Sequence, residues 1–137
     1  MRNVAVLLAL ALLGSTTSDR VELARQKRTA YDMRAIAVAA ESYATDFNKY
    51  PKAKDMADLQ ALLSPTYIRD LPTIDAWGTP FRYFVSADQE RYRLVSAGSD
   101  EKFDPSSLVL GKTPAKSDDI VFEDGTFLQA PEGLTPQ

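Results

Sequence analysis

A long amphipathic helical pattern is the feature that most constrains how this chain folds. Between residues 19 and 48 the apolar side chains recur three and four residues apart, which is the spacing of one helix face. That face consists of Met33, Ile36, Ala37, Ala40, Tyr43, Ala44 and Phe47. Asp19 is the expected N-cap, and the helix must stop before Pro51, which cannot continue it. Because a single helix cannot bury its own apolar face, the rest of the chain must cover it.

After Pro80 the spacing of apolar residues changes to alternation, which is typical of strands. Residues 81–85 and 91–95 each alternate, and residues 87–90 between them have the composition of a loop. We therefore predict a first antiparallel hairpin in this region.

A second hairpin is predicted near the C-terminus. Residues 120–122 and 126–128 are apolar runs separated by Asp124-Gly125, a dipeptide that favours a tight two-residue turn. The order of helices first and strands afterwards predicts an α+β fold. In this fold the long N-terminal helix packs on a small antiparallel β-sheet.

The segment between helix and sheet carries a short helix and a corner. Asp55 is the expected N-cap of a helix whose apolar face is Met56, Leu59, Leu62 and Leu63. Residues 77–80, Trp-Gly-Thr-Pro, are typical of a structural corner that leads into a strand, with Asp75 capping the turn. A role for Trp77 in stacking on a ligand is the alternative.

The N-terminus is apolar but short. Residues 4–13 form an unbroken apolar run, which as a helix is about 15 Å long, or about half the hydrocarbon thickness of a bilayer. Residues 1–18 are therefore predicted as a cleaved secretory signal or as the end of a longer hydrophobic helix. The expected organisation is this segment, one domain over residues 19–130, and a flexible tail over 131–137.

Composition excludes several kinds of chemistry. The 137 residues include no cysteine and no histidine, and the formal net charge is −3. Thiolate nucleophiles, imidazole bases and Cys- or His-ligated metal sites are thereby excluded. An acidic chain is also a poor nucleic-acid binder, so no nucleic-acid partner is expected. Carboxylate chemistry and oxygen-ligated cations remain. No catalytic motif is evident, so we predict a protein that is not an enzyme and rank a carboxylate-dependent hydrolase last.

The connection between the two hairpins, residues 98–119, is unusually long for a compact domain. Its two ends carry Asp100, Asp104, Asp118 and Asp119, and Glu101 is adjacent. Carboxylates brought together repel one another unless a cation neutralises them, and calcium accepts irregular oxygen-only sites. A solvated acidic loop without metal is the alternative.

Five segments of the sequence resemble a known family. They are residues 32–36 (DMRAI), 43–51 (YATDFNKYP), 71–72 (LP), 75–83 (DAWGTPFRY) and 94–100 (LVSAGSD). Together they resemble the major, G-type pseudopilin of type II secretion systems and its type IV pilin-like relatives, in order from about Arg25 to Phe127. The resemblance implies a pilin-like fold of a long helix, a short helical segment and an antiparallel sheet.

The resemblance also implies a calcium ion in the long loop. By position, Asp100 matches the aspartate of the family motif and Ala97 the residue that offers a main-chain carbonyl. Asp119 matches the second aspartate of a later pair, while Ser117 stands where the first is expected and Asp118 is the substitute. The implied metal ligands are therefore Ala97, Asp100, Asp118 and Asp119.

The function implied is structural. The chain is expected to assemble with copies of itself and with other pseudopilins into a periplasmic pseudopilus for protein secretion, at the periplasmic face of the bacterial inner membrane. Residues 1–18 leave open a contact with that membrane. The Gly-Phe-Thr-Leu-Ile-Glu start of the family is absent from this sequence. The alternative is therefore a soluble, exported or periplasmic pilin-like binding module that does not polymerise.

Overall fold

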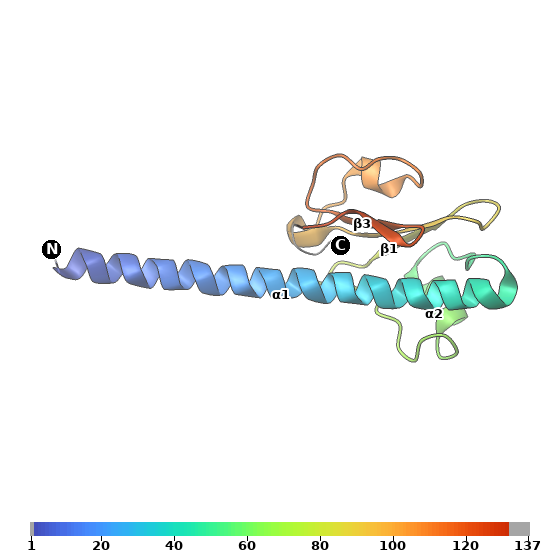
Figure 1. The fold of residues 1–137 in the computed structure, drawn as a ribbon, viewed down its shortest axis with the longest axis horizontal. Coiled ribbons are helices and arrows are strands. Elements are labelled where there is room, and N and C mark those ends of the chain that lie inside the picture. Colours follow the sequence, from blue (N-terminus) through green and yellow to red (C-terminus); the bar gives the residue numbers. More distant parts are fainter. Residues whose placement is uncertain (1, 132–137) are drawn as a thin grey trace.

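The N-terminal helix is longer than the sequence pattern predicts. The computed structural model describes residues 2–131, with side chains from residue 17 onward, and α1 (Arg2–Phe47) is a single helix of 46 residues (Figure 1). The expectation that Asp19 caps this helix is wrong. The residues before it are also helical, so Asp19 has no free helix end to cap. A cleavage site near residue 18 stays a prediction.

The end of α1 and the short helix follow the sequence pattern closely. Asn48 takes a left-handed conformation (φ 58°) and its N–H donates to the carbonyl of Ala44 at 2.7 Å. The second helix, α2 (Met56–Leu63), has Asp55 as its N-cap, confirming the prediction. Met56, Leu59 and Leu63 are buried as predicted, whereas Leu62 is 38% exposed.

Four antiparallel strands form one sheet in the order β1-β2-β3-β4. Their bounds are Arg82–Val85 (β1), Tyr92–Ser96 (β2), Ile120–Glu123 (β3) and Thr126–Gln129 (β4). The turn between β3 and β4 has positive φ at both Asp124 (48°) and Gly125 (96°), as a two-residue hairpin turn requires. Both predicted hairpins are confirmed, and pairing of β2 with β3 joins them.

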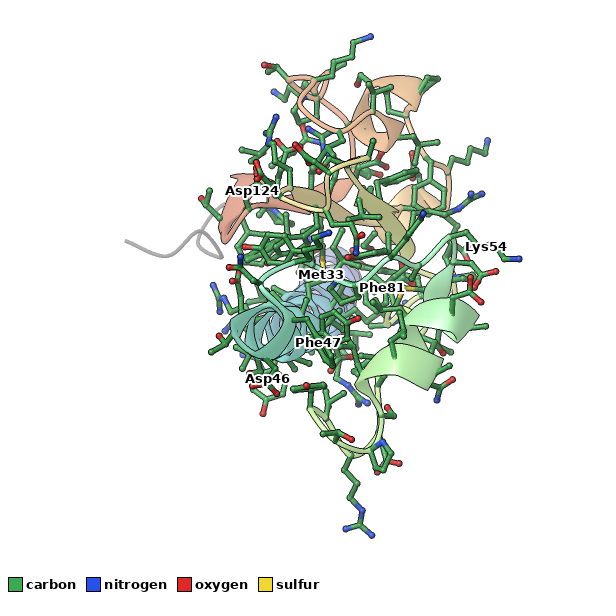
Figure 2. All side chains as sticks on the ribbon, turned by 90° about the vertical axis from the view of Figure 1, so that its right-hand side faces the viewer. Met33, Asp46, Phe47, Lys54, Phe81 and Asp124 are labelled. Carbon is green, nitrogen blue, oxygen red and sulfur yellow. The ribbon has the colours of Figure 1, made fainter. Side chains whose placement is uncertain are left out.

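The core lies where α1 meets the sheet and α2. Figure 2 looks along α1, with the sheet on one side of the helix and α2 on another, and with Met33 and Phe81 in the interior. Met33, Ile36 and Leu94 are each 1% exposed or less. Phe47, which the helical pattern assigns to the buried face, is 58% exposed and packs on Tyr43 instead, with ring centroids 4.5 Å apart.

The structure therefore has the predicted α+β, pilin-like architecture. Within residues 2–131, no helix contains a stretch that is both long enough and apolar enough to span a bilayer.

Candidate functional site

The long loop between β2 and β3 lies over the face of the sheet opposite α1 (Figure 1). It contains two short 3-10 turns, Gly98–Asp100 and Pro105–Leu108. The predicted connection is thus ordered rather than extended. It brings the acidic residues at its two ends back to the junction of β2 and β3.

Asp119 is the most buried carboxylate of this loop, at 1% exposed. Its Oδ2 accepts a hydrogen bond from the N–H of Asp104 at 2.8 Å. Its Oδ1 and the hydroxyl of Ser107 are both enclosed and make no hydrogen bond of standard geometry, although the Ser107 hydroxyl lies close enough to lower the pKa of Asp119. A buried carboxylate oxygen without a donor is costly, so this position is short of positive charge.

The electrostatics of Asp119 lead to the same conclusion. Burial raises the pKa of Asp119 above its usual value, and the charges of Asp100 and Asp104 raise it further, while the Asp104 N–H and the Ser107 hydroxyl oppose the rise. The hydroxyl and N–H of Ser106 both donate to the Asp104 carboxylate and lower its pKa. Asp104 therefore stays ionised beside Asp119.

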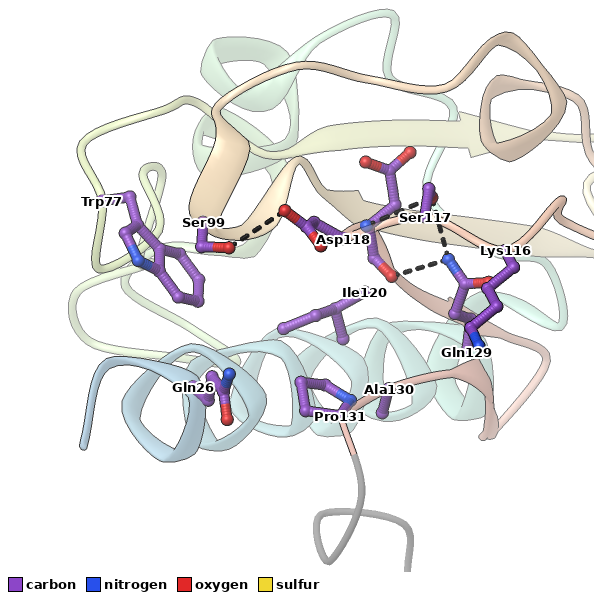
Figure 3. Close-up of a pocket in the computed structure, with 11 residues that line it drawn as sticks. Gln26, Trp77, Ser99, Lys116, Ser117, Asp118, Ile120, Gln129, Ala130 and Pro131 are labelled. Carbon is purple, nitrogen blue, oxygen red and sulfur yellow. Dashed lines mark hydrogen bonds between the residues drawn. The ribbon is translucent and has the colours of Figure 1, made fainter. Parts of the chain in front are cut away.

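The other predicted ligands are arranged differently. Asp100 Oδ1 accepts from the N–H of Lys102 at 3.0 Å, and Ala97 is fully buried at the start of the first 3-10 turn. Asp118 instead accepts a hydrogen bond from the hydroxyl of Ser99 at 3.0 Å, beside a surface pocket that Trp77 also lines (Figure 3). Asp118 and Asp119 thus have different partners.

Within the described residues, no three acidic side chains converge closely enough to hold a metal ion as they stand. The structure brings Asp104 to Asp119 through a direct hydrogen bond, with Asp100 near enough to influence its pKa. The ligand set expected from the resemblance leaves out Asp104. Asp104 and Asp119 are fifteen residues apart, so no local sequence pattern indicates that they lie together.

Asp75 organises the corner next to this loop. It is 4% exposed, and its Oδ1 accepts from the N–H groups of Trp77 and Thr79, both at 3.0 Å. Its Oδ2 accepts from the hydroxyl of Ser96, at the end of β2, at 2.8 Å. The predicted turn-capping role is confirmed, and Asp75 also joins the corner to the strand that leads into the loop.

Trp77 anchors this corner to the long helix. Its indole N–H donates to Glu22 of α1 at 3.3 Å, and the N–H of Ala76 donates to the hydroxyl of Thr29 at 3.1 Å. Both contacts support the structural interpretation of the corner. Trp77 also lines the pocket shown in Figure 3, so its role in stacking on a ligand stays a prediction.

A comparison with protein families settles what kind of chain this is. Residues 17–107 match the family described as type II secretion system (T2SS), protein G. The chain belongs to this family. The match spans α1 from residue 17, α2, the corner, β1, β2 and the first half of the loop. No curated protein and no solved structure matches the chain.

Family membership confirms the resemblance seen in the sequence. Members of this family are the major pseudopilins, structural components of the type II secretion system. The match ends at residue 107, so it includes Ala97 and Asp100 but neither Asp118 nor Asp119.

Proposed function

We propose that this chain is a subunit of a periplasmic pseudopilus and that it assembles with copies of itself and with other pseudopilins. Type II pseudopilins sit at the periplasmic side of the inner membrane, and we place this chain there. The observation that carries the proposal is the shape of α1. Its C-terminal half packs against the sheet, while its N-terminal half extends well beyond the globular part (Figure 1).

The distribution of charge supports contacts between copies. Residues 1–28 contain five basic and two acidic side chains, which gives a net charge of +3. Because the whole chain has a formal net charge of −3, residues 29–137 have a net charge of −6. Arg20, Arg25, Lys27 and Arg28 are all exposed on α1. Opposite charges on the helix and on the globular part favour staggered side-by-side packing, in which the helix of one copy faces the acidic part of the next.

The outer face of α1 provides apolar area for the same contact. Tyr31 is 71% exposed and Val38 is 65% exposed, and seven residues, or about two helical turns, separate them. In the proposed contact both side chains would be covered, which would bury apolar area.

A secretion assay in the producing bacterium tests this function. Deleting the gene should leave substrates of the type II system in the periplasm, and the full chain should restore their secretion. The double variant Tyr31→Asp/Val38→Asp should not restore secretion, because it places charge in the proposed contact while leaving the core unchanged. Arg69→Ala is the matched control, since this side chain is 94% exposed in a different region. Normal secretion in the deletion strain would contradict the proposal.

We also propose that the loop holds a calcium ion at Asp119. The donor types suit this ion: Asp119 has a buried oxygen that makes no hydrogen bond of standard geometry, and the carboxylates of Asp100 and Asp104 act on its pKa. Among the described residues these carboxylates do not converge as they stand, so binding would draw them closer together. Calcium prefers carboxylate and main-chain carbonyl oxygens in irregular loops. Asp119, Asp100 and the carbonyl of Ala97 would hold it, with Asp104 as a further ligand, and Asp118 would join only by giving up Ser99.

The calcium ion would neutralise these carboxylates and tie the end of β2 to the start of β3. Its contribution would be stability of the globular part, because a ligand that binds the folded chain alone stabilises it.

A further inference from the structure

The face of the sheet opposite α1 contains a buried arginine that the proposed calcium site does not use. Arg93 is the second residue of β2 and is 0% exposed. Alternation along this strand predicts that Arg93 points away from α1, where a charged side chain is normally solvated. Here the loop folds over that face and encloses the guanidinium group.

Most hydrogen bonds of Arg93 go to the loop rather than to the sheet. Its Nη1 donates to the carbonyls of Ser106 (3.3 Å) and Ser107 (3.1 Å), and its Nη2 donates to the carbonyl of Lys112 at 2.5 Å. Its Nε donates to Glu123 at 3.1 Å, the residue that faces it across the β2–β3 pair. One guanidinium group thus gathers three main-chain carbonyls, as a bound cation would.

Glu123 holds the same part of the loop through the opposite charge. Its Oε1 also accepts a hydrogen bond from the N–H of Gly111 at 2.6 Å, and its Oε2 lies 3.5 Å from Arg91 Nη2. Gly111 has a φ of +86°, and a Cβ there would lie 3.2 Å from the Arg91 side chain. The Arg93–Glu123 pair therefore binds carbonyls and an N–H from two successive turns of the same loop.

A cross-strand ion pair that only joined β2 to β3 would not need to be buried under the loop. Burying two charges costs several kcal/mol per ion, and a buried pair is often no more stabilising than apolar side chains of the same volume. The same pair on an uncovered sheet face would avoid that cost. The buried pair here fixes the position of the loop, because three of the four hydrogen-bond partners of Arg93 are loop carbonyls.

We propose that Arg93 is a built-in cation that orders residues 105–112 independently of any metal ion. The loop then has two anchors. Arg93 and Glu123 hold residues 105–112, and the calcium site of the proposed function acts on residues 98–104 and 116–119. The second half of this statement rests on the calcium proposal, but the first half does not.

Hydrogen exchange followed by mass spectrometry on the full chain, in chelator and in excess calcium, separates the two anchors. We expect the amides of Gly111 and Lys112, which donate to Glu123 and to the carbonyl of Val109, to exchange equally slowly in both conditions. The amides of Ser106 and Ser107 donate to Asp104, on the calcium side of the loop, and do not separate the two anchors. Residues 98–104 and 116–119 should exchange faster in chelator. The inference is overturned if chelation exposes Gly111 and Lys112 together with the rest of the loop. If neither part responds, the calcium proposal fails and the role of Arg93 is decided by variants.

The decisive variant is the double substitution Arg93→Met/Glu123→Leu, which removes both charges and leaves neither buried alone. We expect exchange of residues 105–112 to become about tenfold faster or more, even in calcium, while β2 and β3 stay protected. Arg93→Lys should give an intermediate effect, since one ammonium group cannot reach all four acceptors. Arg69→Met is the control for loss of an arginine. Wild-type protection of residues 105–112 in the double variant would refute the proposal.

Discussion

Asp75 shows how one residue joins two parts of this fold. Its carboxylate accepts two N–H groups from the Trp77–Thr79 turn and the hydroxyl of Ser96. The same Ser96 hydroxyl accepts the N–H of Gly98, at the start of the loop, at 3.1 Å. A change at Asp75 should therefore affect both the corner and the beginning of the loop.

Replacing Asp75 by alanine should lower the free energy of unfolding by about 3 kcal/mol, because three donors lose a largely buried charged acceptor. Asp75→Asn should lose less, since its carbonyl oxygen can still accept from the turn. Urea unfolding measures both variants. Asp70→Ala is the control, because Asp70 is 94% exposed and its removal should change stability by less than about 0.5 kcal/mol. Equal stability of Asp75→Ala and Asp70→Ala would be inconsistent with this role.

Individual residues also differ in how well the sequence predicts their roles. Asp55 and Asp75 were predictable as capping residues because their partners lie within four positions in the chain. Arg93 was not, because its burial depends on residues 106–112, which fold back over β2. Alternation indicates which face of a sheet a side chain occupies, but it does not indicate what covers that face.

Among the elements, the loop between β2 and β3 depends on one glycine. Gly98 has a φ of +73°, and a Cβ added there would lie 2.0 Å from the carbonyl oxygen of Asp118. The two ends of the loop therefore touch at a point where a side chain does not fit.

Gly98→Ala should destabilise the chain by about 3 kcal/mol or more, since it combines backbone strain with a clash against main chain. Gly125→Ala is the matched control. Gly125 also has positive φ (+96°), but nothing lies within 4 Å of its added Cβ, so only the strain of about 1 kcal/mol applies. Thermal unfolding of both variants measures the difference. If Gly98→Ala and Gly125→Ala lower the stability of the chain equally, the close approach at Gly98 has no energetic role.

Calcium is the second test of this loop. At a calcium concentration about 100-fold above the dissociation constant, binding stabilises by about 2.7 kcal/mol, or about 10 °C in thermal midpoint for a chain of this size. Chelation should remove that gain from the full chain, and Asp100→Ala and Asp119→Ala should abolish the response. Asp70→Ala should keep it. A midpoint of the unsubstituted chain that is the same with and without chelator would rule out the calcium ion.

Local patterns predicted most elements, and tertiary contacts decided the rest. Both hairpins, α2 and the end of α1 were predictable because turn and capping residues act within a few positions. The start of α1 was not, because the Gly-Ser-Thr run at residues 14–18 has the composition of a helix exit and yet continues the helix. The contact between Asp104 and Asp119 depends on how the loop closes, and the spacing of apolar residues does not predict this closure.

At the scale of the whole molecule, the central claim is that copies of this chain assemble through a long helix and an oppositely charged globular part. Such a contact joins two different surfaces, so it repeats from copy to copy, and it builds an open filament, rather than a dimer, when the repeated rotation does not close into a ring. The soluble pilin-like module is the competing function, and it predicts no repeated contact.

Cysteine crosslinking in the producing bacterium tests this claim most directly, because the chain has no cysteine of its own. One cysteine replaces Ala24, which is exposed among the basic residues of α1, and a second replaces Ser99 or Val109, which are exposed on the loop. With a bifunctional thiol reagent, we predict a ladder of dimers, trimers and higher multimers for the double variants and at most dimers for each single variant. Monomers alone, from cells whose type II system is secreting, would contradict the account.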